Sequence, residues 1–135
     1  MINSIFISAI VHATEDPNKV KTAMLNIIPS NLRSICEIQE NYAKGHHGNP
    51  IIILNMNIRN SKIATEIFNY IINSFSKTYI SLIKSNPNLY SDGNSIFLRL
   101  DKQAAYNGVI QLSFSDDVIK IKIVSSNPME IISKL

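Results

Sequence analysis

The N-terminal third of the chain switches between strand-like and helix-like hydrophobic patterns. Residues 3–13 are apolar on both faces, which predicts a buried central strand. Asp16 and Pro17 then open an apolar stripe at helical spacing that stops at Pro29, as expected for a capped helix. Residues 33–42 alternate less regularly and predict a second strand.

The middle of the chain shows the clearest periodicity. From Ile51 to Arg59 apolar and polar residues alternate, which predicts a third strand with one buried face. From Ser61 to Ser85 the apolar residues keep the helical period throughout. We therefore expect one long helix of about 36 Å, enough to cross a small sheet.

The C-terminal part predicts several short elements. Ser95 to Leu100 is a fourth strand, and Asp101 to Asn107 is a short helix stopped by Gly108. The remaining predicted elements are a hairpin of residues 109–115 and 118–124 across Asp116-Asp117, and a final short helix within residues 128–135.

This order of elements predicts an α+β fold in a single domain spanning residues 1–135. We expect a mostly antiparallel sheet of five to six strands, with two main helices packed on one face. The other face would be polar and basic with few aromatic side chains, and would carry Asn55, Asn57, Arg59, Arg99, Gln111, Lys120 and Lys122.

The composition suits a globular protein and narrows the setting. The 135 residues are 45% hydrophobic and 17% charged, and the net charge of +3 is compatible with a polyanionic partner. The one cysteine, Cys36, excludes an internal disulfide and favours a reducing, cytoplasmic setting. The apolar start indicates a strand rather than a signal peptide, and no apolar run approaches the roughly 20 residues of a membrane span.

The stretch Lys44-Gly45-His46-His47-Gly48-Asn49-Pro50 carries the most distinctive chemistry. A structural loop needs glycine and proline, but it does not need two imidazoles. The pattern favours a polar ligand, with nucleic acid first and metal second. The simpler alternative is a hairpin turn whose histidines have no role.

The metal alternative is a hydrolase site made of His12, His46 and His47. Adjacent histidines on an extended chain point in opposite directions, and no zinc-binding, nucleotide-binding or nucleophile motif is present. The sequence therefore favours a protein that is not an enzyme and has no metal or other cofactor.

A second polar segment surrounds the end of the fourth strand. Arg99, Lys102 and Gln103 flank Asp101, which is a natural helix cap. Arginine, lysine and glutamine are frequent partners of nucleic-acid backbone and bases. The simpler alternative is again a capped helix with polar surface residues.

Three segments together resemble one family: residues 12–16, 45–51 and 98–106 are similar to archaeal proteins predicted to bind RNA and proposed as exosome subunits. The similarity extends from about Ser4 to Val124. His46 matches the family pattern, whereas His47 stands where tyrosine is frequent. The resemblance implies an α+β fold akin to a large-subunit ribosomal protein, RNA binding beside RNA-processing machinery, and no catalysis.

The leading hypothesis is therefore a non-catalytic RNA-binding protein with exosome components as further partners. Lys44, Arg99 and Lys102 would contact phosphates. The scarcity of aromatic residues on the open face favours structured RNA over single strands. The alternative is a protein-interaction module or homodimer built on the long helix. The residues expected to hydrogen-bond RNA, including its 2′-hydroxyls, are His46, Asn49 and Gln103.

Overall fold

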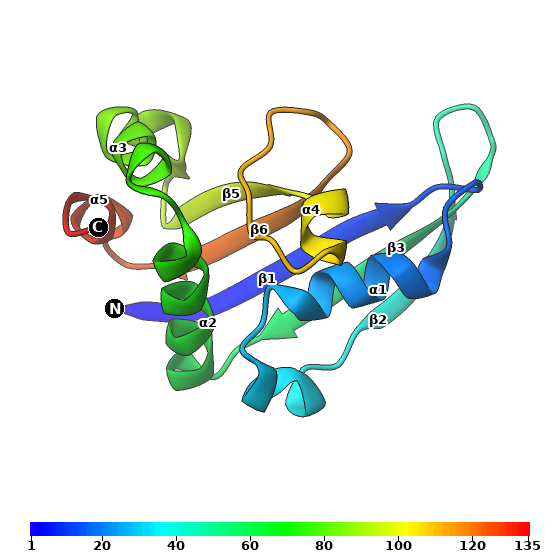
Figure 1. Cartoon of the computed structure of the whole chain (residues 1–135), viewed down its shortest axis with the longest axis horizontal. Coiled ribbons are helices and arrows are strands. Elements are labelled where there is room, and N and C mark those ends of the chain that lie inside the picture. Colours follow the sequence, from blue (N-terminus) through cyan, green and yellow to red (C-terminus); the bar gives the residue numbers. More distant parts are fainter.

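The computed structural model describes residues 1–135 and contains one six-stranded antiparallel sheet with helices packed against it (Figure 1). The strands are β1 (Ile2–Val11), β2 (Gln39–Lys44), β3 (Pro50–Ile58), β4 (Ser91–Asp92), β5 (Ser95–Asp101) and β6 (Val118–Ser125). The helices are α1 (Pro17–Asn26), α2 (Ser61–Ser74), α3 (Lys77–Ser85), α4 (Lys102–Tyr106) and α5 (Pro128–Ser133), with 3-10 turns η1 (Ser30–Ile35) and η2 (Pro87–Leu89).

The sheet has one buried face, as the alternation predicts. The strand order is β2-β3-β1-β6-β5-β4, so β1 and β6 are central. On the inner face, Ile7 of β1 stands between Met56 of β3 and Ile121 of β6, and all three are at most 1% exposed. Helices α1 and α2 pack on this side against β1 (Figure 1). The prediction of an antiparallel sheet with both main helices on one face is confirmed.

Residues 30–36 form a turn rather than part of a strand, so the predicted strand over 33–42 is wrong in its first half. Helix α1 ends at Asn26, and the carbonyl of Pro29 accepts the N–H of Leu32 at 2.9 Å to start η1. The Arg33 Nε donates to the carbonyl of Ile28 at 3.0 Å and satisfies a free group past the helix end. Strand β2 begins only after the buried Cys36.

The long helix predicted over residues 61–85 is two helices. The backbone of Phe75 is extended, with ψ of 145°, and the Ser76 side chain accepts the N–H of Tyr79 as an N-cap for α3. The rings of Phe75 and Tyr79 meet edge to face at 5.6 Å. Because apolar residues continue at helical spacing across the break, periodicity alone did not reveal the capping serine. No helix has the length and hydropathy that crossing a membrane requires.

The predicted hairpin of residues 109–115 and 118–124 is also wrong, because both edges of β6 are already paired with β1 and β5. Residues 109–115 instead run along the outer edge of β5. The Ser113 N–H donates to the carbonyl of Arg99, and the Asp101 N–H donates to the carbonyl of Gln111, both at 2.9 Å. Only one bridge, Leu100 to Leu112, is regular enough to count as sheet.

Helix α4 ends at Tyr106, and Gly108 terminates it as predicted. The N–H of Gly108 donates to Ala105 and that of Val109 donates to Ala104, the two bonds of a Schellman turn. This turn requires a left-handed residue, and Gly108 has φ of 81°.

The Gly108 turn gives a stability prediction. Gly108→Ala should lower the free energy of unfolding by about 1–2 kcal/mol, because an L-residue pays that much for left-handed backbone. A new methyl group would meet no atom within 4 Å, so the cost is conformational. Gly108→Asn is the matched control and should lose clearly less, since Asn tolerates this conformation. Urea denaturation of both variants measures the difference, and equal losses would contradict the explanation.

Candidate nucleic-acid interface

The outer face of the sheet carries two rows of side chains from neighbouring strands. Residues directly opposite each other on paired strands point to the same side. In the first row, Arg99 of β5 stands opposite Lys120 of β6, Lys120 stands opposite Ser8 of β1, and Ser8 stands opposite Asn55 of β3. This row therefore runs from two cations to a hydroxyl and an amide.

The second row, one step further along the strands, contains two aromatic rings. Phe97 of β5 and Phe6 of β1 lie on either side of Lys122, and Phe6 stands opposite Asn57. The guanidinium of Arg59 lies 5.3 Å from the centre of the Phe6 ring, a cation–π contact. The sequence pattern predicted few aromatic residues on this face and did not indicate these two.

The cations of this face have few acidic partners. Lys120, Lys122 and Arg59 form no ion pair, and the nearest pair of Arg99 is a 3.8 Å contact with the fully exposed Asp116. The outward positions of β1, β3 and β6 hold no Asp or Glu. Arg99 and Lys120 stand directly opposite each other, and such like-charge pairs are unfavourable in a sheet. An anion bound beside them would relieve this repulsion.

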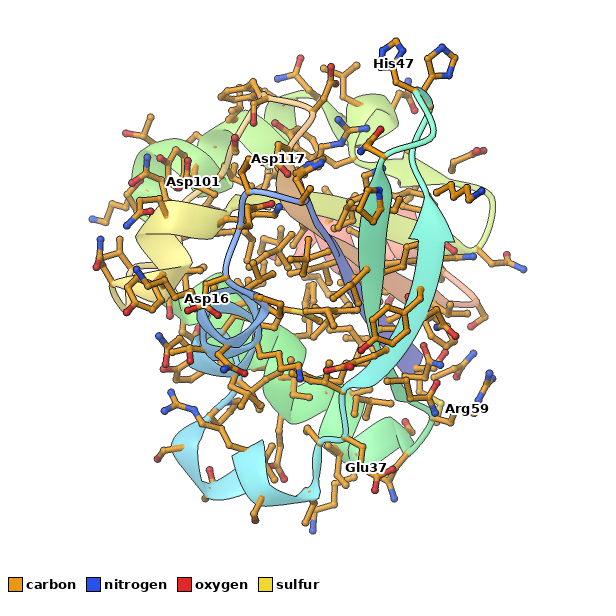
Figure 2. The ribbon with its side chains drawn as sticks, turned by 90° about the vertical axis from the view of Figure 1, so that its right-hand side faces the viewer. Asp16, Glu37, His47, Arg59, Asp101 and Asp117 are labelled. Carbon is orange, nitrogen blue, oxygen red and sulfur yellow. The ribbon has the colours of Figure 1, made fainter.

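The loop between β2 and β3 is closed by its own backbone. The N–H of Gly45 donates to the carbonyl of Asn49 at 2.6 Å, and Gly48, with φ of 77°, donates to the carbonyl of Gly45. A Cβ on Gly45 would stand 2.6 Å from the Asn49 side chain, so a larger residue there would displace that side chain. The rings of His46 and His47 meet at 5.0 Å, and His47 projects away from the body of the protein (Figure 2).

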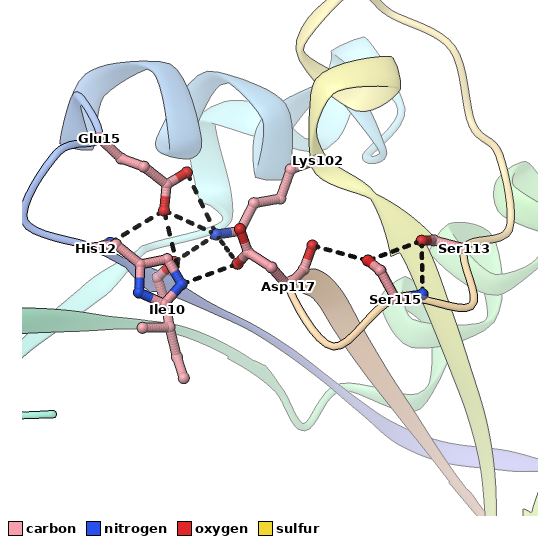
Figure 3. A network of polar contacts seen from close by, with 7 residues as sticks. All are labelled: Ile10, His12, Glu15, Lys102, Ser113, Ser115 and Asp117. Atoms are coloured by element: carbon pink, nitrogen blue, oxygen red, sulfur yellow. Dashed lines mark hydrogen bonds and ion pairs between the residues drawn. The ribbon is translucent and has the colours of Figure 1, made fainter. Parts of the chain in front are cut away.

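A network around Lys102 joins the end of β1 to the loop before β6 (Figure 3). The Lys102 ammonium donates to the carbonyl of Ile10 at 2.6 Å, to Glu15 at 3.1 Å and to Asp117 at 2.5 Å. His12 Nε2 lies 3.1 Å from the same Asp117 oxygen. Only 10% of the Lys102 side chain is exposed, so its charge is used inside the protein.

The environment of Asp117 shifts its acidity. Burial by itself raises the pKa of this carboxyl, but the hydrogen bond and charge of Lys102, together with His12, outweigh burial and hold the pKa below its usual range. Asp117 is therefore ionised in the folded protein, and its ion pair with Lys102 persists into mildly acidic solution.

The hypothetical hydrolase site of His12, His46 and His47 is not assembled. The ligand-type side chains that lie close together are His12, Glu15 and Asp117, whose donor atoms are all within 4.8 Å of one another. The Lys102 ammonium already contacts both carboxylates of this group. A divalent ion would have to displace it.

The six residues expected to bind RNA do not share one surface. Arg99 lies on the open sheet face, and His46 and Asn49 lie in the loop between β2 and β3. Alternation places Lys44 on the side of Glu40, which pairs with Lys21 of α1, so Lys44 faces the helical side. The two remaining residues belong to α4, where Lys102 is paired internally and Gln103 is exposed.

The sequence patterns did not identify three aromatic residues on or beside the open face, namely Phe6, Phe97 and Phe114. The alternation of Phe97 with buried Ile96 and Leu98 was a usable signal. Phe6 lies in a run that is apolar on both faces, which hides its orientation. Phe114 lies in the segment wrongly assigned to a hairpin, and 77% of it is exposed.

The Lys102 network gives a prediction for stability and pH. Lys102→Met should lower the free energy of unfolding at pH 7 by about 1–3 kcal/mol, because two carboxylates and a carbonyl lose their donor. Lys134→Met, which removes an exposed pair with Glu130, is the matched control and should cost less than about 0.5 kcal/mol.

The pH dependence follows from the lowered pKa of Asp117. A lowered folded-state pKa contributes stability above the unfolded-state pKa, and this contribution disappears as pH falls through the folded-state value. The gap between wild type and Lys102→Met should therefore shrink below about pH 4. Denaturation from pH 7 to pH 2 measures it, and a gap independent of pH would refute the ion-pair explanation.

Solved archaeal structures share this fold. The protein AF2318 of Archaeoglobus fulgidus superposes with a TM-score of 0.80 at 30% identity, over 92% of this chain and 86% of that chain. The protein SSO0741 of Sulfolobus solfataricus superposes with a TM-score of 0.81 at 33% identity, over 98% and 96%. Both are described as DUF54 proteins.

Sequence relatives lead to the same group. The uncharacterized protein MJ0213 of Methanocaldococcus jannaschii is 38% identical over 123 residues, which cover 89% of this chain and 82% of the relative. The RNA-binding protein PAB1135 of Pyrococcus abyssi is 30% identical over 131 residues, covering 95% and 85%. The model of a protein family described as RNA binding matches residues 4–125. Since this match covers most of the chain, the chain belongs to that RNA-binding family.

Proposed function

We propose that this protein is a non-catalytic RNA-binding protein and that the open sheet face is its main contact surface. The observation that carries the proposal is the group of cations on this face, Arg59, Arg99, Lys120 and Lys122, facing solvent with no carboxylate among the outward positions of β1, β3 and β6. Family membership and the name of the Pyrococcus relative support RNA as the ligand.

Phosphate contacts would supply most of the affinity. Each Lys or Arg that reaches a phosphate releases counterions from the RNA, which makes binding weaken as salt rises. The amides of Asn55 and Asn57 and the hydroxyl of Ser8 continue the cationic rows. These neutral groups can hydrogen-bond to 2′-hydroxyls or base edges, which distinguish RNA from DNA.

The loop between β2 and β3 is the second proposed contact. His46 and Asn49 are exposed there. The glycines of this turn have no side chain that would cover the backbone. Lys44 flanks the loop on the helical side of the sheet. Lys102 instead has a positioning role, because its ammonium is held by Ile10, Glu15 and Asp117.

The absence of catalysis is part of the proposal. The polar cluster that most resembles an active site is His12, Glu15, Lys102 and Asp117. Its charged groups bind one another and the backbone, which is what a structural network requires. Substitutions in this cluster should therefore lower the stability of the fold, as expected for a structural network and not for an active site.

The choice between structured and single-stranded RNA depends on the aromatic residues. The preference for structured RNA followed from an open face with few rings, and Phe6 and Phe97 stand on that face.

Association with exosome components follows from the family resemblance. Co-purification with the tagged protein, with and without ribonuclease, tests it, and recovery only without ribonuclease would mean a contact through RNA.

The binding prediction concerns the two central lysines. Lys120→Ala/Lys122→Ala should weaken RNA binding about tenfold, the loss expected if each contact contributes about 0.7 kcal/mol. The slope of log affinity against log salt should fall by about 2, or about 1 for each phosphate contact. Fluorescence anisotropy with a labelled hairpin RNA, a single-stranded RNA and a DNA duplex at several salt concentrations measures both quantities.

The matched control is Lys62→Ala/Lys77→Ala, which removes the same charge from α2 and α3. Neither lysine forms an ion pair, and both are exposed. Equal losses in the two double variants would mean that net charge, rather than the open face, governs binding. A wild-type protein that binds none of the three ligands at low salt would refute the proposed function and favour a protein-interaction role.

A further inference from the structure

A groove opens at the outer edge of β5, where this strand changes neighbours. Its first residues pair with β4, through Ser91 opposite Ile96, and its last residues bond to the segment 111–113. The change of partner falls between Phe97, whose N–H donates to the Tyr90 carbonyl, and Arg99, whose carbonyl accepts from Ser113. The groove there has a volume of about 660 Å³, within the range of about 300–1,000 Å³ that is typical of sites for small organic groups.

The walls of the groove are apolar and accessible. Phe97 lies on the strand, Leu89 on the β4 side and Phe114 on the other side. Their exposed fractions are 41%, 76% and 77%. Two exposed phenylalanines in one concave site are unusual for a surface with only water as a partner, and they indicate a ligand with a flat apolar face.

Cations lie in the same groove. Arg99 and Lys120 line it together with the aromatic residues, and they belong to the cationic row of the open face. Two acidic residues are near: Asp92 also lines the groove, and Asp116 lies 3.8 Å from Arg99. Both ends of that contact are well exposed, with side-chain accessibilities of 50% and 109%, so a phosphate can compete for the guanidinium.

The backbone is anchored on both sides of Phe114. The Ser113 N–H donates to the Arg99 carbonyl on β5, and Asp117 is held by Lys102 and His12. Phe114 lies between these two attachments, on the loop that leads from α4 into β6 (Figure 1). The backbone on both sides of Phe114 is therefore anchored, which keeps the ring at the groove.

We infer that this groove binds an unpaired base of the RNA, stacked on Phe114 and Phe97, while Arg99 and Lys120 hold the adjoining phosphates. The inference rests on the proposed function and specifies its substrate: RNA with at least one single-stranded nucleotide. Bases inside an A-form duplex are already stacked on their neighbours, so a duplex offers the groove only its backbone. Stacking on aromatic side chains tolerates any base, so little sequence preference is expected at this site.

The test combines a change in the protein with a change in the RNA. Phe114→Ala removes the exposed ring, and Tyr42→Ala is the matched control, since Tyr42 is 76% exposed and lies on β2 at the opposite edge of the sheet. The two ligands are a fluorescein-labelled oligouridylate and an abasic strand with the same number of phosphates. Anisotropy titrations of wild type and both variants are run at one low salt concentration.

Phe114→Ala should weaken binding of the oligouridylate by about 5- to 100-fold, the range for loss of one stacked base. It should leave binding of the abasic strand unchanged, while Tyr42→Ala should affect neither ligand. Phe114→Trp should restore oligouridylate binding, which separates a stacking role from a structural one.

Four outcomes would overturn the inference. Equal loss of both ligands, or no loss of either, would mean that the ring does not contact a base. If wild type binds both strands equally and Lys120→Ala/Lys122→Ala weakens both, the stacking inference fails while the proposed RNA-binding function stands. If wild type binds neither strand nor a hairpin RNA, both fail together.

Discussion

Burial of one face of the sheet is the constraint on which the rest of this structure depends. Ile5, Ile7 and Ala9 of β1 point into a cluster of 31 buried residues, and β1 is paired on both sides. Since side chains alternate strictly, a slip of one residue in either pairing would turn this set toward water. The same rule fixes the outer face: once Ile121 and Ile123 are inside, Lys120 and Lys122 must be outside.

The Lys102 network has the corresponding role at the end of the sheet. Hydrophobic burial anchors the connection from α4 to β6 at Ile110 and Leu112, but it does not position residues 113–117, most of which are exposed. A nearly buried ammonium with three acceptors is directional, so it holds Asp117 against the end of β1 at Ile10. Unpairing such a group leaves its acceptors unsatisfied, which makes the arrangement specific.

Much of this fold could be predicted from sequence, and the failures have physical causes. Period-two and helical patterns predicted β1, β3, β5, β6, α1 and the α+β class, because they report burial directly. They missed the break at Ser76, since a cap interrupts the backbone without interrupting the apolar stripe. They also missed the pairing of residues 109–115 with β5, because pairing depends on which edges are free. The sequence showed polar residues at the end of β1. It could not show that Glu15 contacts Lys102, because 87 positions separate the two residues.

The anchored loop between α4 and β6 separates the residues that hold the fold from the residue proposed to contact the ligand. Lys102, Asp117 and the backbone of Ser113 fix the loop, while the side chain of Phe114 contributes almost nothing to the core. Substitution at this one position therefore changes the shape and chemistry of the groove at little cost in stability. If the groove binds an unpaired base as inferred, the residue at this position would set the strength of stacking without any repacking of the core.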